Sequence, residues 1–430
     1  MDGAARTAGS RTLSRPGQPT FREVFAVGEF RALWLAQLLS VAGDQVARVA
    51  MTVLVFDRTH SALWTALTYA VTFLPWMIGG LTLSGLADRR PRSEVMVACD
   101  AGRMVLVFLM ALVSLKSASA AALWIMVALL FGVTLLDSPF KSARSAMMPD
   151  VLPGERYVLG TAVTQTTLQV GLVSGFALGG LVVAVLGVRA ALLVDAATFA
   201  ASAVLIRLWV RHRPSAADPA AGSRSQFAEM AAGVRLVFGD RRLRTLMLLG
   251  WLVAFYVVPM GLAAPYAASF HTSLAIPVST GLVFAAGPFG TALGAVVLGR
   301  RVPQAWRERL MGPLAIATCG VLLLCWIKPG LVAALLIIAG SGACASYQLA
   351  ANAAFVASVP PDRRGQAFGL ANGGMQVTQG LWIVLAGAAA SSSAISPGIA
   401  IAISGGLGAV LAAALAIGTR RQPTNTGIGL

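Results

Sequence analysis

The chain has 430 residues, of which 57% are hydrophobic and only 12% are charged, and its formal net charge is +16. A soluble domain carries about twice that charged fraction, so composition excludes a soluble fold for most of the chain. Nucleic acid would need a basic surface on a soluble fold, but here the positive charges sit in short clusters between long apolar stretches. We therefore expect no nucleic-acid partner, and we expect membrane lipids to be the partners of these clusters.

The apolar stretches have the length of membrane-crossing helices. A span needs roughly 20 apolar residues, and it must be helical because lipid cannot satisfy backbone hydrogen bonds. The pattern predicts an all-α polytopic membrane protein with about twelve transmembrane helices. The predicted spans are residues 31–56, 62–87, 94–115, 119–138, 158–186, 188–209, 243–269, 278–299, 310–327, 331–358, 366–390 and 396–418.

The basic residues between the spans predict the orientation. With the N-terminus inside, 26 of the 33 Lys and Arg residues fall in inside segments and four in outside loops. Because positive charge marks the cytoplasmic side, we expect both termini to be cytoplasmic and the protein to lie in the cell (inner or plasma) membrane. Residues 1–20 contain no apolar stretch, so no cleaved signal peptide is expected.

A central hydrophilic stretch divides the chain into two halves. Apolar residues from Phe227 to Phe238 recur at helical spacing and predict an amphipathic surface helix at its end. The glycine pattern around Gly160 is repeated around Gly369, which favours two equivalent bundles. The predicted domains are a cytoplasmic tail (1–30), an N-terminal six-helix bundle (31–210), a cytoplasmic linker with its helix (211–242), a C-terminal six-helix bundle (243–419) and a second cytoplasmic tail (420–430).

The loop between the second and third spans reads Ser84-Gly85-Leu86-Ala87-Asp88-Arg89-Arg90-Pro91-Arg92. It resembles the loop 2–3 signature of the major facilitator superfamily, with Ser84 where glycine is usual and Ser93 where a second basic residue is common. The alternative is a positive-inside anchor, which does not require the embedded Asp88. In the family this cluster stabilises one side of an alternating-access cycle. We therefore assign to a predicted gate Gly85, Asp88, Arg89, Arg92, Asp100, Arg103, Asp137 and Arg144.

The fifth span carries a stripe of glycines at helical spacing. Its residues are Gly171, Gly175, Phe176, Gly179 and Gly180. The stripe resembles the antiporter signature of the same superfamily, with Phe176 in the position of the usual proline, and that signature is associated with exporters. The alternative is a face of small residues that lets two helices pack closely.

Three further segments look like the drug and siderophore exporter branch, which includes macrolide efflux pumps and the enterobactin exporter. These segments are Phe30–Trp34 leading to Gly43-Asp44, Ala143–Asp150, and Val194–Phe199. The resemblance implies a major facilitator fold and an export activity.

Charges inside the predicted spans are costly and therefore indicate function. Asp44 lies near the middle of the first span, and Arg48 is one turn away on the same face. We expect Asp44 to carry a proton or bind substrate with Arg48 as its ionic partner; the alternative is a permanent structural pair. Asp195, in the sixth span, is the second candidate for coupling, and otherwise it forms hydrogen bonds within the bundle.

The C-terminal spans contain no acid and offer amides instead. With aromatic side chains, such amides are suited to an amphiphilic substrate cavity, although hydrogen bonds between packed helices are the alternative. The cavity candidates are Trp34, Gln165, Gln169, Asn352, Asn372 and Gln376.

No cofactor, metal site or catalytic residue is expected. The four cysteines and three histidines show no metal-binding spacing, and no phosphate-binding GxxxxGK[ST] motif is present. We therefore predict a monomeric secondary transporter, rather than an enzyme, whose partners are a small-molecule substrate, protons and lipids. The favoured function is proton-coupled export of hydrophobic or amphiphilic compounds. The alternatives are an importer of a small polar solute and a non-transporting protein or enzyme on the same membrane fold.

Overall fold

The computed structural model describes residues 20–75, 90–115, 119–213 and 226–420. Within these ranges the regular structure is entirely helical, with no strand. Nine of the described helical segments are long and apolar enough to cross a membrane. The predicted all-α membrane fold is therefore confirmed, whereas the count of twelve spans remains a prediction.

The N-terminal half consists mostly of long helices; α7 extends beyond the predicted span 119–138, and residues 76–87 of the predicted span 62–87 lie outside the described residues. Its elements are α1 (Phe21–Ala26), α2 (Gly28–Thr59), α3 (Ala62–Ala70), α6 (Arg92–Val113), α7 (Ala120–Val151) and α8 (Glu155–Trp209). The 55 residues of α8 comprise two helices, because Gly187 has a φ of 81°. Only glycine adopts that conformation without steric cost, so the chain turns between two predicted spans at this residue.

The C-terminal half is more interrupted. Its elements are α9 (Gln226–Gly239), α10 (Arg241–Trp251), α11 (Val253–Tyr256), α12 (Val258–Gly261), α13 (Ala263–Ala268), α14 (Ile276–Arg301), α15 (Gln304–Gly320), η1 (Val321–Ile327), α16 (Leu331–Cys344), α17 (Tyr347–Ser358), η2 (Pro361–Arg363), α18 (Arg364–Ala390) and α19 (Pro397–Arg420). Asp240 caps α10 by accepting hydrogen bonds from the amides of Arg242 and Leu243. Pro259 and Pro265 lie among the short helices α11 to α13, where each removes a backbone donor.

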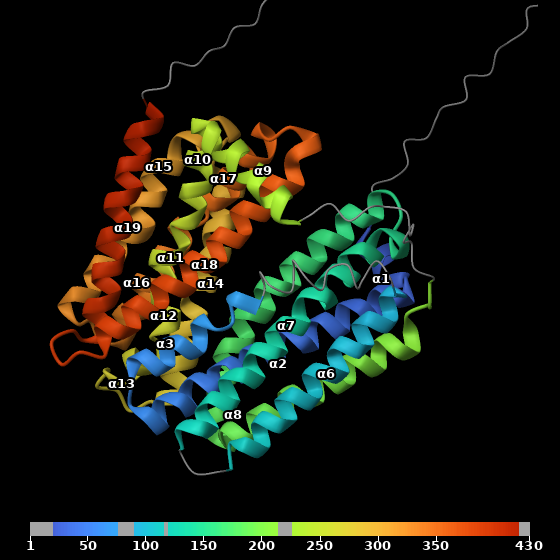
Figure 1. Ribbon diagram of the computed structural model, residues 1–430, viewed down its shortest axis with the longest axis horizontal. Helices are drawn as coiled ribbons and strands as arrows, with labels where there is room; N and C mark the ends of the chain where they lie inside the picture. Colours follow the sequence, from blue (N-terminus) through green and yellow to red (C-terminus); the bar gives the residue numbers. More distant parts are fainter. Residues whose placement is uncertain (1–19, 76–89, 116–118, 214–225, 421–430) are drawn as a thin grey trace, which may run out of the picture.

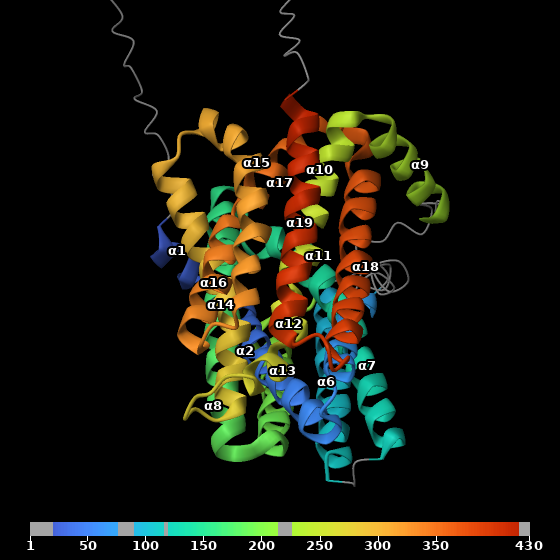
Figure 2. The same cartoon turned by 90° about the vertical axis from the view of Figure 1, so that its left-hand side faces the viewer.

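The two halves form two bundles that meet at one end and diverge toward the other (Figure 1). Figure 2 shows the C-terminal half facing the viewer, with α9 at the end away from the contact. At the contact, the amide of Leu63 donates to Ser391 Oγ over 2.8 Å, and the hydroxyl of Tyr69 lies 3.3 Å from Met260 Sδ. We call this region, which also contains Gly180, the contact end.

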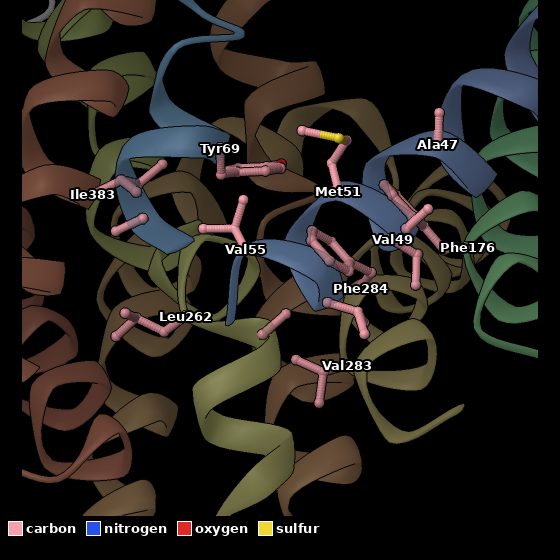
Figure 3. Packing of buried hydrophobic residues seen from close by; sticks show 14 of the residues in the cluster. Ala47, Val49, Met51, Val55, Tyr69, Phe176, Leu262, Val283, Phe284 and Ile383 are labelled. Atoms are coloured by element: carbon pink, nitrogen blue, oxygen red, sulfur yellow. The ribbon is translucent and has the colours of Figure 1, made fainter. Parts of the chain in front are cut away.

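Apolar side chains from both halves fill the contact end (Figure 3). Phe176 from α8 stacks on Phe284 from α14, with ring centroids 4.9 Å apart. Both rings are buried, and inside a membrane such contacts stabilise through van der Waals packing, because lipid tails are as apolar as the side chains. Apolar packing therefore holds the halves together at this end.

Candidate functional site

A buried arginine lies at the centre of a charge cluster in the N-terminal bundle. Arg103, on α6, is 1% exposed. Its Nη2 donates to both carboxylate oxygens of Asp44, on α2, over 3.1 and 3.0 Å. A charge-assisted pair of this kind is stronger than a neutral hydrogen bond, and it joins the two helices inside the bundle.

Two further carboxylates surround the same guanidinium. Asp100 Oδ1 lies 3.4 Å from Arg103 Nη1, and Asp137 Oδ1 lies 3.6 Å from Nη2. Asp100 also accepts a hydrogen bond of 2.5 Å from the hydroxyl of Ser202 on α8. Asp137, on α7, pairs with Lys141 Nζ over 2.6 Å. The cluster therefore draws on α2, α6, α7 and α8.

Aromatic rings cover the guanidinium of Arg103. The ring of Phe199 has its centroid 4.1 Å from Arg103 Cζ, and the ring of Phe140 lies 5.7 Å away. Such rings attract the cation and exclude water, which strengthens the neighbouring ionic interactions.

Asp195, on α8, is 1% exposed and lies on the same side of the bundle as this cluster. Its Oδ1 lies 3.4 Å from the hydroxyl of Thr198, and it forms no salt bridge with any residue that the structure describes. A small cavity of about 30 Å³ adjoins both Asp195 and the cluster. Its lining residues are Asp44, Ala47, Arg48, Thr72, Arg103, Val107, Met110, Leu130, Val133, Thr134, Asp137 and Asp195.

The structure corrects the predicted partner of Asp44. Arg48 lines the same cavity, but the ion pair of Asp44 is formed by Arg103. The reason is tertiary packing, because α8 packs against both α2 and α6 and so brings the Arg103 guanidinium beside the carboxylate of Asp44. Asp100, Arg103 and Asp137, which we assigned to the gate, lie in the cluster around Asp44, and their role in gating stays a prediction.

The remaining gate residues make separate contacts. Arg92 pairs with Asp150 over 2.7 Å and donates to the carbonyl of Ala146 over 2.8 Å, so it ties the start of α6 to the end of α7. Arg144 donates to the side-chain oxygen of Gln37 on α2. Gly85, Asp88 and Arg89 lie outside the described residues.

The glycine stripe of α8 faces two different helices. A Cβ atom at Gly179 would lie 3.0 Å from Val46 Cα of α2, whereas one at Gly180 would lie 3.1 Å from Gly281 Cα of α14. Gly171 and Gly175 also face α2. The stripe therefore packs α8 within its own bundle and, at Gly180, against the other half of the molecule.

None of the six cavity candidates lines the cavity beside Asp44. Trp34 Nε1 donates to Thr167 Oγ1 over 2.7 Å, and Gln376 accepts from Gln379 over 3.1 Å, as expected for bonds between and within packed helices. Gln169 is half-buried, and the exposed members of the set are Gln165, Asn352 and Asn372.

Sequence reasoning missed several polar residues of the site. Ser202 and Lys141 carry no motif, and only their positions one turn from other polar residues could have indicated them. Asp150 had a clearer signal, because it is one of two acids in a predicted loop that also holds three basic residues.

Comparison with known proteins identifies relatives of this chain. The family model of the Major Facilitator Superfamily matches residues 33–342. The multidrug efflux pump Tap of Mycobacterium tuberculosis is 27% identical over 294 residues, which cover 66% of this chain and 68% of the pump. The enterobactin exporter EntS of Shigella dysenteriae is 28% identical over 293 residues, covering 66% of each chain.

Solved structures share the fold. The nucleoside transporter NupG superposes with a TM-score of 0.72 at 14% identity, covering 92% of this chain and 99% of NupG. A bacterial homologue of the human lysosomal transporter Spinster, in an inward-facing and occupied conformation, gives a TM-score of 0.69 at 17% identity, covering 91% and 96% of the two chains. At these identities the likeness establishes the fold alone.

Proposed function

Because the chain belongs to the Major Facilitator Superfamily and is a transporter with a small-molecule substrate, we propose that it exports hydrophobic or amphiphilic organic compounds in exchange for protons. The names of its relatives Tap and EntS, an efflux pump and an exporter, support this direction. We infer that the substrates are drugs, antibiotics, siderophores or the cell's own secondary metabolites. The protein would lie in the cell membrane as a monomer, with both termini in the cytoplasm.

The buried charge cluster is the observation that carries the proposal. Four carboxylates, those of Asp44, Asp100, Asp137 and Asp195, adjoin or surround one fully buried guanidinium. Uncompensated charge inside a membrane protein is costly, so a change in the number of bound protons strongly affects the relative free energies of its conformations. A cluster with more acids than nearby cations is suited to carrying a proton.

Asp44 is the best-placed carrier within this cluster. Its side chain is 22% exposed and lines the cavity, while Asp100 is fully buried. A proton bound to Asp44 would weaken both bonds to Arg103, yet Arg103 would keep Asp100 and Asp137 as partners. Protonation would therefore loosen α2 from α6 without leaving a buried cation unpaired.

Movement of α2 would also affect the contact between the two halves. Helix α2 packs against α8 at Gly179, and the next residue of α8, Gly180, packs against α14 of the other half. We infer that this chain of contacts links the charge of Asp44 to the alternation of access. With the termini in the cytoplasm, the contact end would lie outside, and the present conformation would face the cytoplasm.

Asp44→Asn tests this proposal. The change is nearly isosteric and leaves Arg103 with two carboxylates, so the variant should fold. In proteoliposomes it should still equilibrate a transported dye or antibiotic down its gradient. When a pH difference is imposed, however, its accumulation of substrate should fall to the level reached without that difference.

Asp57→Asn is the matched control, because Asp57 lies on the same helix, is exposed and stands outside the cluster. It should accumulate substrate as the parent does. Uphill transport by Asp44→Asn would exclude Asp44 as the carrier, and Asp195→Asn would then be tested in the same assay. Accumulation in the opposite direction would favour the importer alternative.

A further inference from the structure

A seam between two helices runs along the outer flank of the N-terminal bundle. Helix α6 lies beside the last part of α8 (Figure 1), and two hollows follow one another along this seam. The first, of about 310 Å³, lies where α6 begins and α8 ends. The second, of about 280 Å³, lies deeper along the same pair of helices. Together they form a groove, which we call the α6–α8 groove.

The deep part of the groove is apolar and faces outward. Val105 is 49% exposed and Phe108 is 47% exposed, although both belong to a helix that also carries the fully buried Arg103. Because the alanine side chains on α8 are small, the space between the two helices stays unfilled. The lining residues are Met104, Val105, Phe108, Leu193, Ala196, Ala197 and Ala200. On the surface of a membrane protein such a groove faces lipid chains.

The outer part of the groove carries charges of both signs. Glu94 stands on the α6 side, and Arg207 stands on the α8 side. His212 Nδ1 lies 3.5 Å from Glu94 Oε1, and both side chains are about half exposed. Within the described part of the chain, the exposed Arg207 side chain forms no hydrogen bond or ion pair. A guanidinium and a carboxylate thus flank one hollow.

The length of the groove matches one leaflet of a bilayer. From Glu94 to Phe108 the helical rise gives roughly 21 Å. Half of a bilayer, including its headgroup region, is about 20–22 Å thick. A lipid whose headgroup lies between Glu94 and Arg207 could therefore place an acyl chain along the whole apolar part.

We propose that the α6–α8 groove binds phosphatidylethanolamine. The phosphate of this lipid would accept hydrogen bonds from Arg207, and its ammonium group would donate to Glu94. The choline group of phosphatidylcholine has no N–H donor for Glu94. Phosphatidylglycerol offers no cation at all and would place its negative charge near that carboxylate.

Such a lipid would bridge the two helices that hold much of the charge cluster. Asp100 and Arg103 lie on α6, and Asp195 and Ser202 lie on α8, all with buried side chains. The lipid would contact the opposite, exposed faces of the same helices. We infer that it stabilises the packing of α6 on α8 without taking part in proton or substrate binding.

Native mass spectrometry of the purified full-length chain tests this inference. The detergent-solubilised protein is titrated separately with dioleoyl phosphatidylethanolamine, phosphatidylcholine and phosphatidylglycerol. Because an additional charge-assisted hydrogen bond distinguishes the first lipid, we expect it to bind about tenfold more tightly than phosphatidylcholine. Glu94→Gln should remove this preference, and Arg207→Gln should weaken binding of phosphatidylethanolamine by about tenfold.

Arg300→Gln is the matched control, because Arg300 is an exposed arginine in the last turn of α14, outside the groove. It should bind the lipids as the parent does. Ala200→Trp, which fills the apolar part, should lower the binding of all three, and an unchanged melting temperature without added lipid shows that the variant folds. Equal binding of the three lipids, tightest binding of phosphatidylglycerol, or an undiminished preference in Glu94→Gln would overturn the proposal.

Discussion

Arg103 interacts with three carboxylates at once, and this depends on the shape of its side chain. The guanidinium is planar, always charged and carries several N–H donors, so it can bind Asp44 through one nitrogen and approach Asp100 through another. A lysine ammonium is a single charged centre and could not match this arrangement. Arg103 is therefore the residue on which the ionised state of the cluster depends.

Arg103→Gln should be strongly destabilising. It leaves buried carboxylates without their cation, which costs about 3–5 kcal/mol when one partner of a buried pair is removed. The melting temperature of the purified protein measures the effect. The double variant Arg103→Gln with Asp44→Asn removes one of the stranded charges and should recover part of the loss. A single variant as stable as the parent would show that Arg103 does not hold the cluster together.

The sequence indicated that Asp44 is functional, because an acid in the middle of an apolar span is rare and costly. It did not indicate the correct partner. Helical periodicity reports neighbours within a few residues and therefore pointed to Arg48, whereas Arg103 is 59 positions away in sequence. Only the fold, in which α8 packs against both α2 and α6, brings the two together.

At the scale of elements, α8 packs against two different helices through adjacent glycines. Gly179 allows α2 to approach within the bundle, and Gly180 allows α14 to approach from the other half. The stripe was recognisable in the sequence as a small-residue face. Its division between two partners was not, because residues of one helical stripe can face different helices when those helices cross it at an angle.

Gly180→Val should separate the halves at the contact end while leaving each bundle folded. The new Cβ would lie 3.1 Å from Gly281 Cα and from Val278 Cα, and backbone atoms at that distance cannot move aside independently. In a background without the four native cysteines, Phe284→Cys should react several-fold faster with a water-soluble thiol reagent once Gly180→Val is added. This residue is buried in the present conformation.

Leu181→Val is the control for that measurement, since Leu181 is the adjacent residue of α8 and is 51% exposed. It should leave the reactivity of the cysteine at position 284 unchanged. If the cysteine at position 284 reacts at the same rate with and without Gly180→Val, the contact between α8 and α14 adapts to a larger side chain.

At the scale of the whole molecule, the repeated glycine pattern and the central hydrophilic stretch predict a division into two halves. Neither feature predicts how the two halves are arranged relative to each other. An alternating-access transporter must populate at least two arrangements whose free energies differ by only a few kcal/mol, so its sequence is compatible with both. The structure holds one of them, with the halves joined at Leu63, Tyr69 and Gly180.

A disulfide across the contact end should stop transport by fixing this arrangement. Leu63 and Ser391 belong to different halves, and the amide of Leu63 lies 2.8 Å from Ser391 Oγ. Cysteines at both positions are therefore close enough to be oxidised to a disulfide, which would prevent the halves from parting where alternating access requires them to. Oxidised Leu63→Cys/Ser391→Cys should transport no more substrate than liposomes without protein, and reduction should restore the rate. Each single cysteine variant should be insensitive to the oxidant. Continued transport by the fully cross-linked protein would mean that the contact end stays closed throughout the cycle, and alternation between the two halves would have to be abandoned as the mechanism.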